Sequence, residues 1–209
     1  MAVAFFHKKT IKEVNLTNKR ILLRADFNVP MNEKGEIQST FRITQSLPTI
    51  QYLLKENAQI TILAHLGRPE GKVVKDLSLE RVARYLNEEA KIPTQFFSDC
   101  VGDGVFQALK KCKPGTVSLL ENVRFHAGEE ENSPEFAKAI IETVQPDYVV
   151  QDGFGVVHRA HASTEGISHL KPALAGLLLE TEYTRLMKAM SEPNRPLVAV
   201  VGGAKMADK

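Results

Sequence analysis

The chain has 209 residues, 43% of them hydrophobic and 25% charged, and a formal net charge of +2. This composition fits a globular protein of one or two domains and excludes a disordered chain. The lysines and arginines form no run of five or more, so nucleic acid is not expected as a partner. Because no apolar stretch is long enough for a membrane span or the core of a signal peptide, we expect a cytoplasmic protein that does not bind membranes.

Short β-branched and leucine-rich runs alternate with helical patterns along the whole chain. This alternation is typical of a parallel sheet wrapped by helices. We therefore expect an α/β fold with a Rossmann-like parallel sheet and helices on both faces, in three α/β/α layers. The predicted strands are residues 20–24, 59–64, 94–97, 117–120, 148–151 and 197–201.

Helical patterns fill the gaps between the predicted strands. Ile43, Leu47, Ile50 and Leu54 recur at helical spacing and mark one face of a helix, although Pro48 argues against a regular first turn. Residues 79–90, 105–111 and 177–190 also have helical patterns.

A helix that begins at residue 134 has the clearest start signal in the chain. Ser133 suits the N-cap position, Pro134 the first helical position and Glu135 the first turn. Apolar residues follow at helical spacing over 136–144, which predicts one face packed inward.

The cysteines and histidines match no known metal pattern. Cys100 and Cys112 form no CxxC motif, and we interpret both as reduced structural thiols. His158 and His161 form an HxxH, but no third ligand is spaced to join them, so no metal site is expected.

Polar and basic side chains follow four of the predicted strands. Taken singly, turn chemistry or a solvated surface position explains each of them. Because the carboxyl ends of parallel strands meet at one edge, where ligands bind, their repetition predicts a basin for a small polyanion. The residues are Asp26 and Asn28 after the first strand, His65 and Arg68 after the second, Arg124 after the fourth and Arg159 after the fifth.

The segments that carry these residues, in this order, resemble the first half of phosphoglycerate kinase. The segments are RILLRADFNVP at 20–30, HLGRP at 65–69, ENVRF at 121–125, HRAH at 158–161 and VAVVGGAKMADK at 198–209. Enzymes of this family are roughly twice as long. The resemblance therefore implies an N-terminal 3-phosphoglycerate-binding domain at 1–175 and an interdomain helix at 176–193. Residues 194–209 would be the first strand and glycine-rich loop of an otherwise absent nucleotide-binding domain.

The resemblance implies an activity in glycolysis. Enzymes of this family transfer a phosphoryl group reversibly between 1,3-bisphosphoglycerate with ADP and 3-phosphoglycerate with ATP. The ATP or ADP and its Mg²⁺ would be bound mainly by the absent half, so this chain alone is expected to bind substrate without turnover. A monomer is also expected.

The resemblance also implies roles for single residues. Arg42 would lie nearest the reacting carboxylate and stabilise the phosphoryl group in flight. Lys205 would steady the transferred group, and Gly203 and Lys209 would lie at the nucleotide phosphates. The substrate would be held by Asp26 and Asn28 at the glycerate body and by His65, Arg68, Arg124 and Arg159 at the remote phosphate.

Some positions depart from the pattern of the family, and we expect them to affect loop packing more than chemistry. They are Phe41, Ala64, Gly153, Val156 and Val157. Two other functions remain alternatives. The basin could serve a non-catalytic anion-binding module. A Rossmann-type dehydrogenase is disfavoured because no glycine-rich fingerprint follows the first strand.

Overall fold

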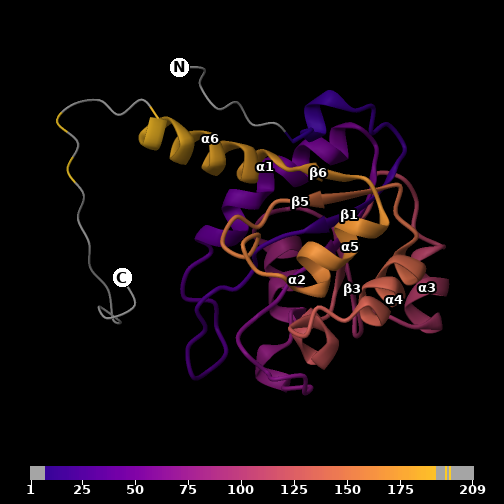
Figure 1. Cartoon of the computed structure of the whole chain (residues 1–209). Coiled ribbons are helices and arrows are strands. Elements are labelled where there is room, and N and C mark those ends of the chain that lie inside the picture. Colours follow the sequence, from indigo (N-terminus) through magenta and orange to yellow (C-terminus); the bar gives the residue numbers. More distant parts are fainter. Residues whose placement is uncertain (1–7, 192–195, 197, 199–209) are drawn as a thin grey trace.

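The computed structural model describes residues 8–191, 196 and 198 (Figure 1). The predicted strand at 197–201 and the residues Gly203, Lys205 and Lys209 lie outside this part of the chain.

The described part of the chain forms a parallel sheet in the order β3-β4-β2-β1-β5-β6. The strands are β1 Arg20–Arg24, β2 Gln59–Leu63, β3 Thr94–Phe97, β4 Val117–Leu120, β5 Tyr148–Gln151 and β6 Ala173–Ala175. The first five confirm the predicted strands, with β2 one residue shorter. The sequence did not predict β6, because three residues after Pro172 are too few to show a periodic pattern.

The chain connections run to opposite sides of the sheet from the neighbouring parallel strands β1 and β5. The chain leaves β1 for β2 on one side of this pair, and it leaves β5 for β6 on the other side. In open α/β sheets, the loops after two such strands diverge and leave a crevice outside their carboxyl ends. The fold therefore places a ligand crevice where the residues after β1 and β5 meet.

Helices cover both faces of the sheet, which confirms the three-layer prediction. The α-helices are α1 Phe41–Lys55, α2 Glu80–Glu88, α3 Asp103–Leu109, α4 Pro134–Val144, α5 Ile167–Leu170 and α6 Leu177–Ser191. Short helical turns join them: η1 Ile11–Glu13, η2 Lys75–Leu77, η3 Val123–Phe125, η4 Ala127–Glu129 and the π-helix η5 Ala162–Gly166.

Successive side chains of a strand point to opposite faces, and each face has its own core. Ile21 and Leu23 of β1 pack in one cluster with Ile50 of α1, and α2 covers the same face. Leu22 packs in the other cluster with Ile140 of α4, and α3 and α5 cover that face. Figure 1 shows α6 beside α1.

The start of α4 confirms its sequence signal. Ser133 is the N-cap, its Oγ accepts the N–H of Phe136 at 3.2 Å, and Pro134 is the first helical residue. Gln145 ends the helix in the left-handed conformation. The other predicted helices are also present, with ends shifted by up to two residues.

The buried face of α1 is rotated from the predicted one. Leu47 and Leu54 are only half-buried, whereas Thr49 and Leu53 are fully buried. Thr49 lies inside because its hydroxyl donates to Asp152 Oδ1 at 2.9 Å and accepts the N–H of Leu177 at 3.0 Å. The start of α6 thus rests on a polar contact with α1.

Two further features of the described residues are the state of the cysteines and the length of the helices. Both Cys100, which is buried, and Cys112, which is half-buried, are free thiols. Within residues 8–191, no helix has the length and apolar character needed to cross a bilayer.

Candidate active site

The polar residues predicted from the strand ends do converge on the carboxyl edge of the sheet. Asp26 follows β1, His65 follows β2, Arg124 lies in η3 after β4, and Arg159 lies in the loop after β5. Contacts between these loops, described below, hold the residues near one another at this edge.

Asp26 and Arg42 form an ion pair at the crevice between β1 and β5. Asp26 Oδ2 accepts from Arg42 Nη1, and Asp26 Oδ1 accepts the backbone N–H of Asn28 at 3.2 Å. The Asp26 side chain is 8% exposed and that of Arg42 is 47% exposed. The buried carboxylate therefore fixes one end of the guanidinium and leaves the remaining N–H groups facing the crevice.

A pocket of about 240 Å³ opens beside this pair. Its walls include Phe154 and Gly155 from the loop after β5 and Leu178 and Glu182 from α6. A Cβ atom on Gly155 would lie 2.7 Å from Asp26 Oδ2, so only glycine allows the loop to approach the ion pair this closely. The pocket lies at the crevice that the strand order predicts.

Asn28 and Arg124 both hold the turn at Gly67. Asn28 Oδ1 accepts the Gly67 N–H at 2.9 Å, and Arg124 Nη1 donates to the Gly67 carbonyl at 2.8 Å. Gly67 has φ +64°, in the left-handed region that favours glycine. This turn presents Arg68 to solvent, and the Arg68 side chain has no polar partner among the residues that the structure describes.

Arg124 is buried but only partly satisfied. Its Nη2 lies 3.2 Å from Glu130 Oε1, while its Nε is buried with no hydrogen-bond partner in the described structure. Burial lowers the pKa of Arg124, and repulsion from Arg159 and Arg68 adds to this despite the opposing charge of Glu130. The three guanidinium groups therefore lie near one another with spare donors.

His65 is buried among the arginines, with 3% of its surface exposed. Burial, together with repulsion from Arg24, Arg124, Arg42 and Arg159, lowers the pKa of His65 to about 2. The imidazole is therefore neutral. Its Nδ1 lies 3.3 Å from Arg24 Nη2, which can only donate, so Nδ1 accepts and Nε2 carries the proton.

Arg24 is a residue that the motif analysis missed. It occupies the last position of β1 and is 1% exposed. Its Nε donates to Ser163 Oγ at 2.7 Å, and Ser163 Oγ in turn donates to Glu129 Oε1 at 2.6 Å. The sequence feature that could have indicated Arg24 was a charged residue at the end of an apolar run within a strand. That feature does not show which distant residues the Arg24 side chain contacts.

Glu129 is the acidic centre of this buried network. Burial alone would raise its pKa, but the nearby His161, the charge of Arg24 and hydrogen bonds from Ser163 outweigh burial and lower the pKa below its usual value. The ionised carboxylate balances Arg24 and ties η4 to η5.

Arg159 is exposed in the loop between β5 and η5. Its carbonyl accepts from His161 N–H at 3.0 Å and from the hydroxyl of Thr164, while its guanidinium has no polar partner among the described residues. The backbone of Arg159 is thus held in place, while its guanidinium group has no polar partner among the described residues, as is also true of Arg68.

Gly153 and Val156 pack closely together in the loop after β5. A Cβ atom on Gly153 would lie 3.0 Å from Val156 Cγ2 and 3.4 Å from Asp26 Cβ. The absence of a side chain at Gly153 leaves room for the buried side chain of Val156. Gly153 therefore lets the loop pack closely on both Val156 and Asp26.

Comparison with known proteins identifies the family. The sequence model for phosphoglycerate kinase matches residues 11–209. The chain belongs to the phosphoglycerate kinase family. It is 49% identical over 202 residues to phosphoglycerate kinase from Moorella thermoacetica and 46% identical over 203 residues to that from Chlorobium phaeovibrioides. Each match covers 97% of this chain and 51% of the relative, so the chain spans about half the length of the curated relatives.

Solved phosphoglycerate kinases have the same fold. The structure from Coxiella burnetii superposes with a TM-score of 0.82 at 41% identity, and that from Pyrococcus horikoshii OT3 with 0.86 at 35% identity. Both cover 96% of this chain and 50% of the solved chain. The resemblance stated from the motifs is confirmed, and membership in a kinase family does not favour the alternative of a non-catalytic anion-binding module.

Proposed function

We propose that this chain is the 3-phosphoglycerate-binding part of a phosphoglycerate kinase. The observation that carries the proposal is that Arg68 and Arg159 both lie near Arg124, next to the neutral His65. Two of these guanidinium groups are exposed without a polar partner among the described residues, and the third has a buried, unpaired Nε. A phosphate monoester supplies the oxygens and the negative charge that such a set of donors lacks.

The Nε2–H of His65 fits the same ligand. A neutral imidazole with a fixed tautomer offers one donor and adds no charge of its own. Arg24 and Glu129 would act behind it as positioning residues.

The glycerate body would lie between the phosphate-binding cations and the Asp26–Arg42 pair. Asp26 can accept a substrate hydroxyl, and the Nδ2 group of Asn28 has no partner among the described residues and can donate. Arg42 would then face the substrate carboxylate.

The proposed reaction needs charge neutralisation rather than a general base. A carboxylate oxygen of 3-phosphoglycerate attacks the γ-phosphorus of ATP, an O–P bond forms, and the bond to the bridging oxygen of ADP breaks. The nucleophile is already ionised. Arg42, fixed in advance by Asp26, would stabilise the charge on the transferring group.

We expect the nucleotide and Mg²⁺ to be held mainly by the half of the relatives that this chain does not span. Mg²⁺ would neutralise charge on the nucleotide phosphates. Among residues 8–191, the one cluster of three potential metal-ligating residues lies beyond β3, away from the pocket between β1 and β5. Gly203, Lys205 and Lys209 remain the proposed contacts of this chain to the nucleotide. A cytoplasmic monomer likewise remains a proposal.

Calorimetric titration of this chain with 3-phosphoglycerate tests the proposal. Arg159→Ala should weaken binding by roughly 10- to 100-fold, since it removes a charge-assisted contact to phosphate. Arg84→Ala is the matched control, because Arg84 is exposed on α2 at a separate surface pocket. A coupled assay with ATP should show no turnover. Binding no tighter than that of sulfate, or equal loss in both variants, would contradict the proposal.

A further inference from the structure

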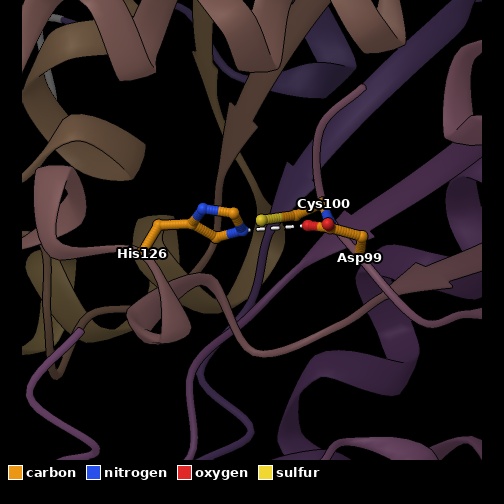
Figure 2. Close-up of side chains that lie close together, drawn as sticks. All are labelled: Asp99, Cys100 and His126. Atoms are coloured by element: carbon orange, nitrogen blue, oxygen red, sulfur yellow. Dashed lines mark hydrogen bonds and ion pairs between the residues drawn. The ribbon is translucent and has the colours of Figure 1, made fainter. Parts of the chain in front are cut away.

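Asp99, Cys100 and His126 come together at the edge of the sheet, outside the substrate basin (Figure 2). Asp99 and Cys100 lie in the loop after β3, and His126 lies between η3 and η4. A carboxylate oxygen, the thiol sulfur and an imidazole nitrogen all lie within 4.8 Å of one another. Ligand atoms that share one tetrahedral cation lie somewhat closer, so small side-chain movements would complete such a site.

The three groups converge on one point rather than forming a proton relay. His126 Nε2 is 2.9 Å from Asp99 Oδ1, and Figure 2 shows the Cys100 sulfur on the same side of the ring. A Cys-His-Asp nucleophilic triad needs the carboxylate and the thiol on different ring nitrogens. Burial, together with repulsion from Asp99, Glu129 and Glu121, raises the pKa of the Cys100 thiol well above its usual value. The cysteine is therefore not an activated nucleophile.

The Asp99 carboxylate, which lies beside the thiol, favours a cation at this place. A carboxylate attracts a metal ion, and a bound metal ion stabilises a neighbouring thiolate. To bind, the cation must displace the thiol proton of Cys100. This cost lowers the net affinity of the site for the cation.

The surroundings hold the ligands and leave an entry path. The His126 ring stacks on Phe136 of α4 with 4.8 Å between ring centroids, which fixes its orientation. Cys100 is fully buried, while the side chains of Asp99 and His126 are 50% and 32% exposed. Asp99 and His126 cover the sulfur and reach solvent themselves, so a cation would enter by separating their 2.9 Å contact.

We propose that Asp99, Cys100 and His126 bind one divalent cation of the zinc class, with water completing a tetrahedral shell. A set of one sulfur, one nitrogen and one oxygen ligand suits Zn²⁺ or Co²⁺ and not Mg²⁺, which requires oxygen ligands. The bound cation would tie the loop after β3 to the loop between η3 and η4. The site is independent of the proposed kinase function.

Titration of this chain with Co²⁺ under reducing conditions tests the site. We expect one equivalent to bind and to produce a thiolate-to-cobalt charge-transfer band that Zn²⁺ abolishes by displacement. Cys100→Ser should lose the band. His126→Phe, which keeps a ring on Phe136 but removes the ligand nitrogen, should weaken binding roughly tenfold or more, as should Asp99→Asn. Cys112→Ser, the control at the other free thiol, should bind normally.

The proposal would be overturned by the absence of a charge-transfer band with wild-type protein, by a band that survives Cys100→Ser, or by a band lost in Cys112→Ser. Should Cys100→Ser not fold, His126→Phe and Asp99→Asn decide the matter, because both residues are partly exposed. Unchanged Co²⁺ affinity in these two variants contradicts the site. None of these results depends on 3-phosphoglycerate binding.

Discussion

The Asp26 carboxylate at the end of β1 holds the guanidinium of Arg42 in the first turn of α1. One partner is buried and the other is half-exposed, so the pair presents a fixed cation to the crevice between β1 and β5. Arg68 differs, because it lies exposed on a glycine turn without such an anchor. This difference predicts different kinetic roles for the two arginines.

Arg42→Ala should chiefly slow phosphoryl transfer, whereas Arg68→Ala should chiefly weaken substrate binding. Removing a preorganised group that faces developing charge lowers kcat by on the order of 10²- to 10³-fold. Removing a phosphate contact lowers affinity by roughly 10- to 100-fold. The measurement is kcat, KM and a separate Kd, in an enzyme that joins this chain to the remaining half of the Moorella thermoacetica relative. A rise in KM alone for Arg42→Ala would make Arg42 only a further substrate contact.

His65 should remain a neutral imidazole with its proton on Nε2 throughout the pH range in which the protein is folded. Burial and the surrounding arginines lower its pKa to about 2, and Arg24 occupies Nδ1. Because the unfolded chain binds the proton more tightly, this group destabilises the fold as pH falls below about 6.5. Nitrogen chemical shifts of the ring, measured from pH 5 to 8, report both properties. A titrating His65 signal in this range would contradict the assigned environment.

Asp152→Asn should change how stability depends on pH. Burial raises the pKa of Asp152 to about 6, although hydrogen bonds from Thr49, Leu178 and Leu179 oppose the rise. The folded protein then binds this proton more tightly than the unfolded chain does. The resulting stabilisation is full below the unfolded pKa near 3.8 and is lost as pH rises through about 6.

The free energy of unfolding in urea, measured at several pH values for wild type and Asp152→Asn, isolates this contribution from that of His65. Between about pH 4 and pH 7, the wild type should lose roughly 2–3 kcal/mol relative to the variant. Asparagine keeps the acceptor for Thr49 and Leu178 without the ionisation. Parallel pH profiles for the two proteins would show that Asp152 does not titrate in this range.

Gly67→Ala and Gly104→Ala should have opposite effects on stability. Gly67 has φ +64°, and a Cβ atom there would lie 2.7 Å from a methyl group of Leu77, so alanine should cost about 1–2 kcal/mol. Gly104 lies inside α3, and a Cβ atom there would meet no neighbouring atom within 4 Å, so alanine should stabilise by up to about 1 kcal/mol. Urea unfolding of both variants gives the two values. Equal effects would show that the turn at Gly67 tolerates a side chain.

The sequence by itself determined the layered fold and the family. The alternating patterns arise from local contacts between each strand or helix and a core, so five strands and the Ser133 cap could be predicted from residues close together in the chain. The polar residues at the strand ends could be placed in one basin, because all parallel strands end at the same edge.

Only the tertiary structure decided which polar groups meet. The contacts of Arg24 with Ser163 and His65, of Thr49 with Asp152, and of Asn28 with Gly67 join residues far apart in the sequence, and no local pattern specifies them. The same holds for β6, which forms because β5 offers free backbone groups, and for the meeting of Cys100 with His126. Local propensity sets where an element begins and ends, whereas burial and hydrogen-bond satisfaction between distant segments set what each side chain can do.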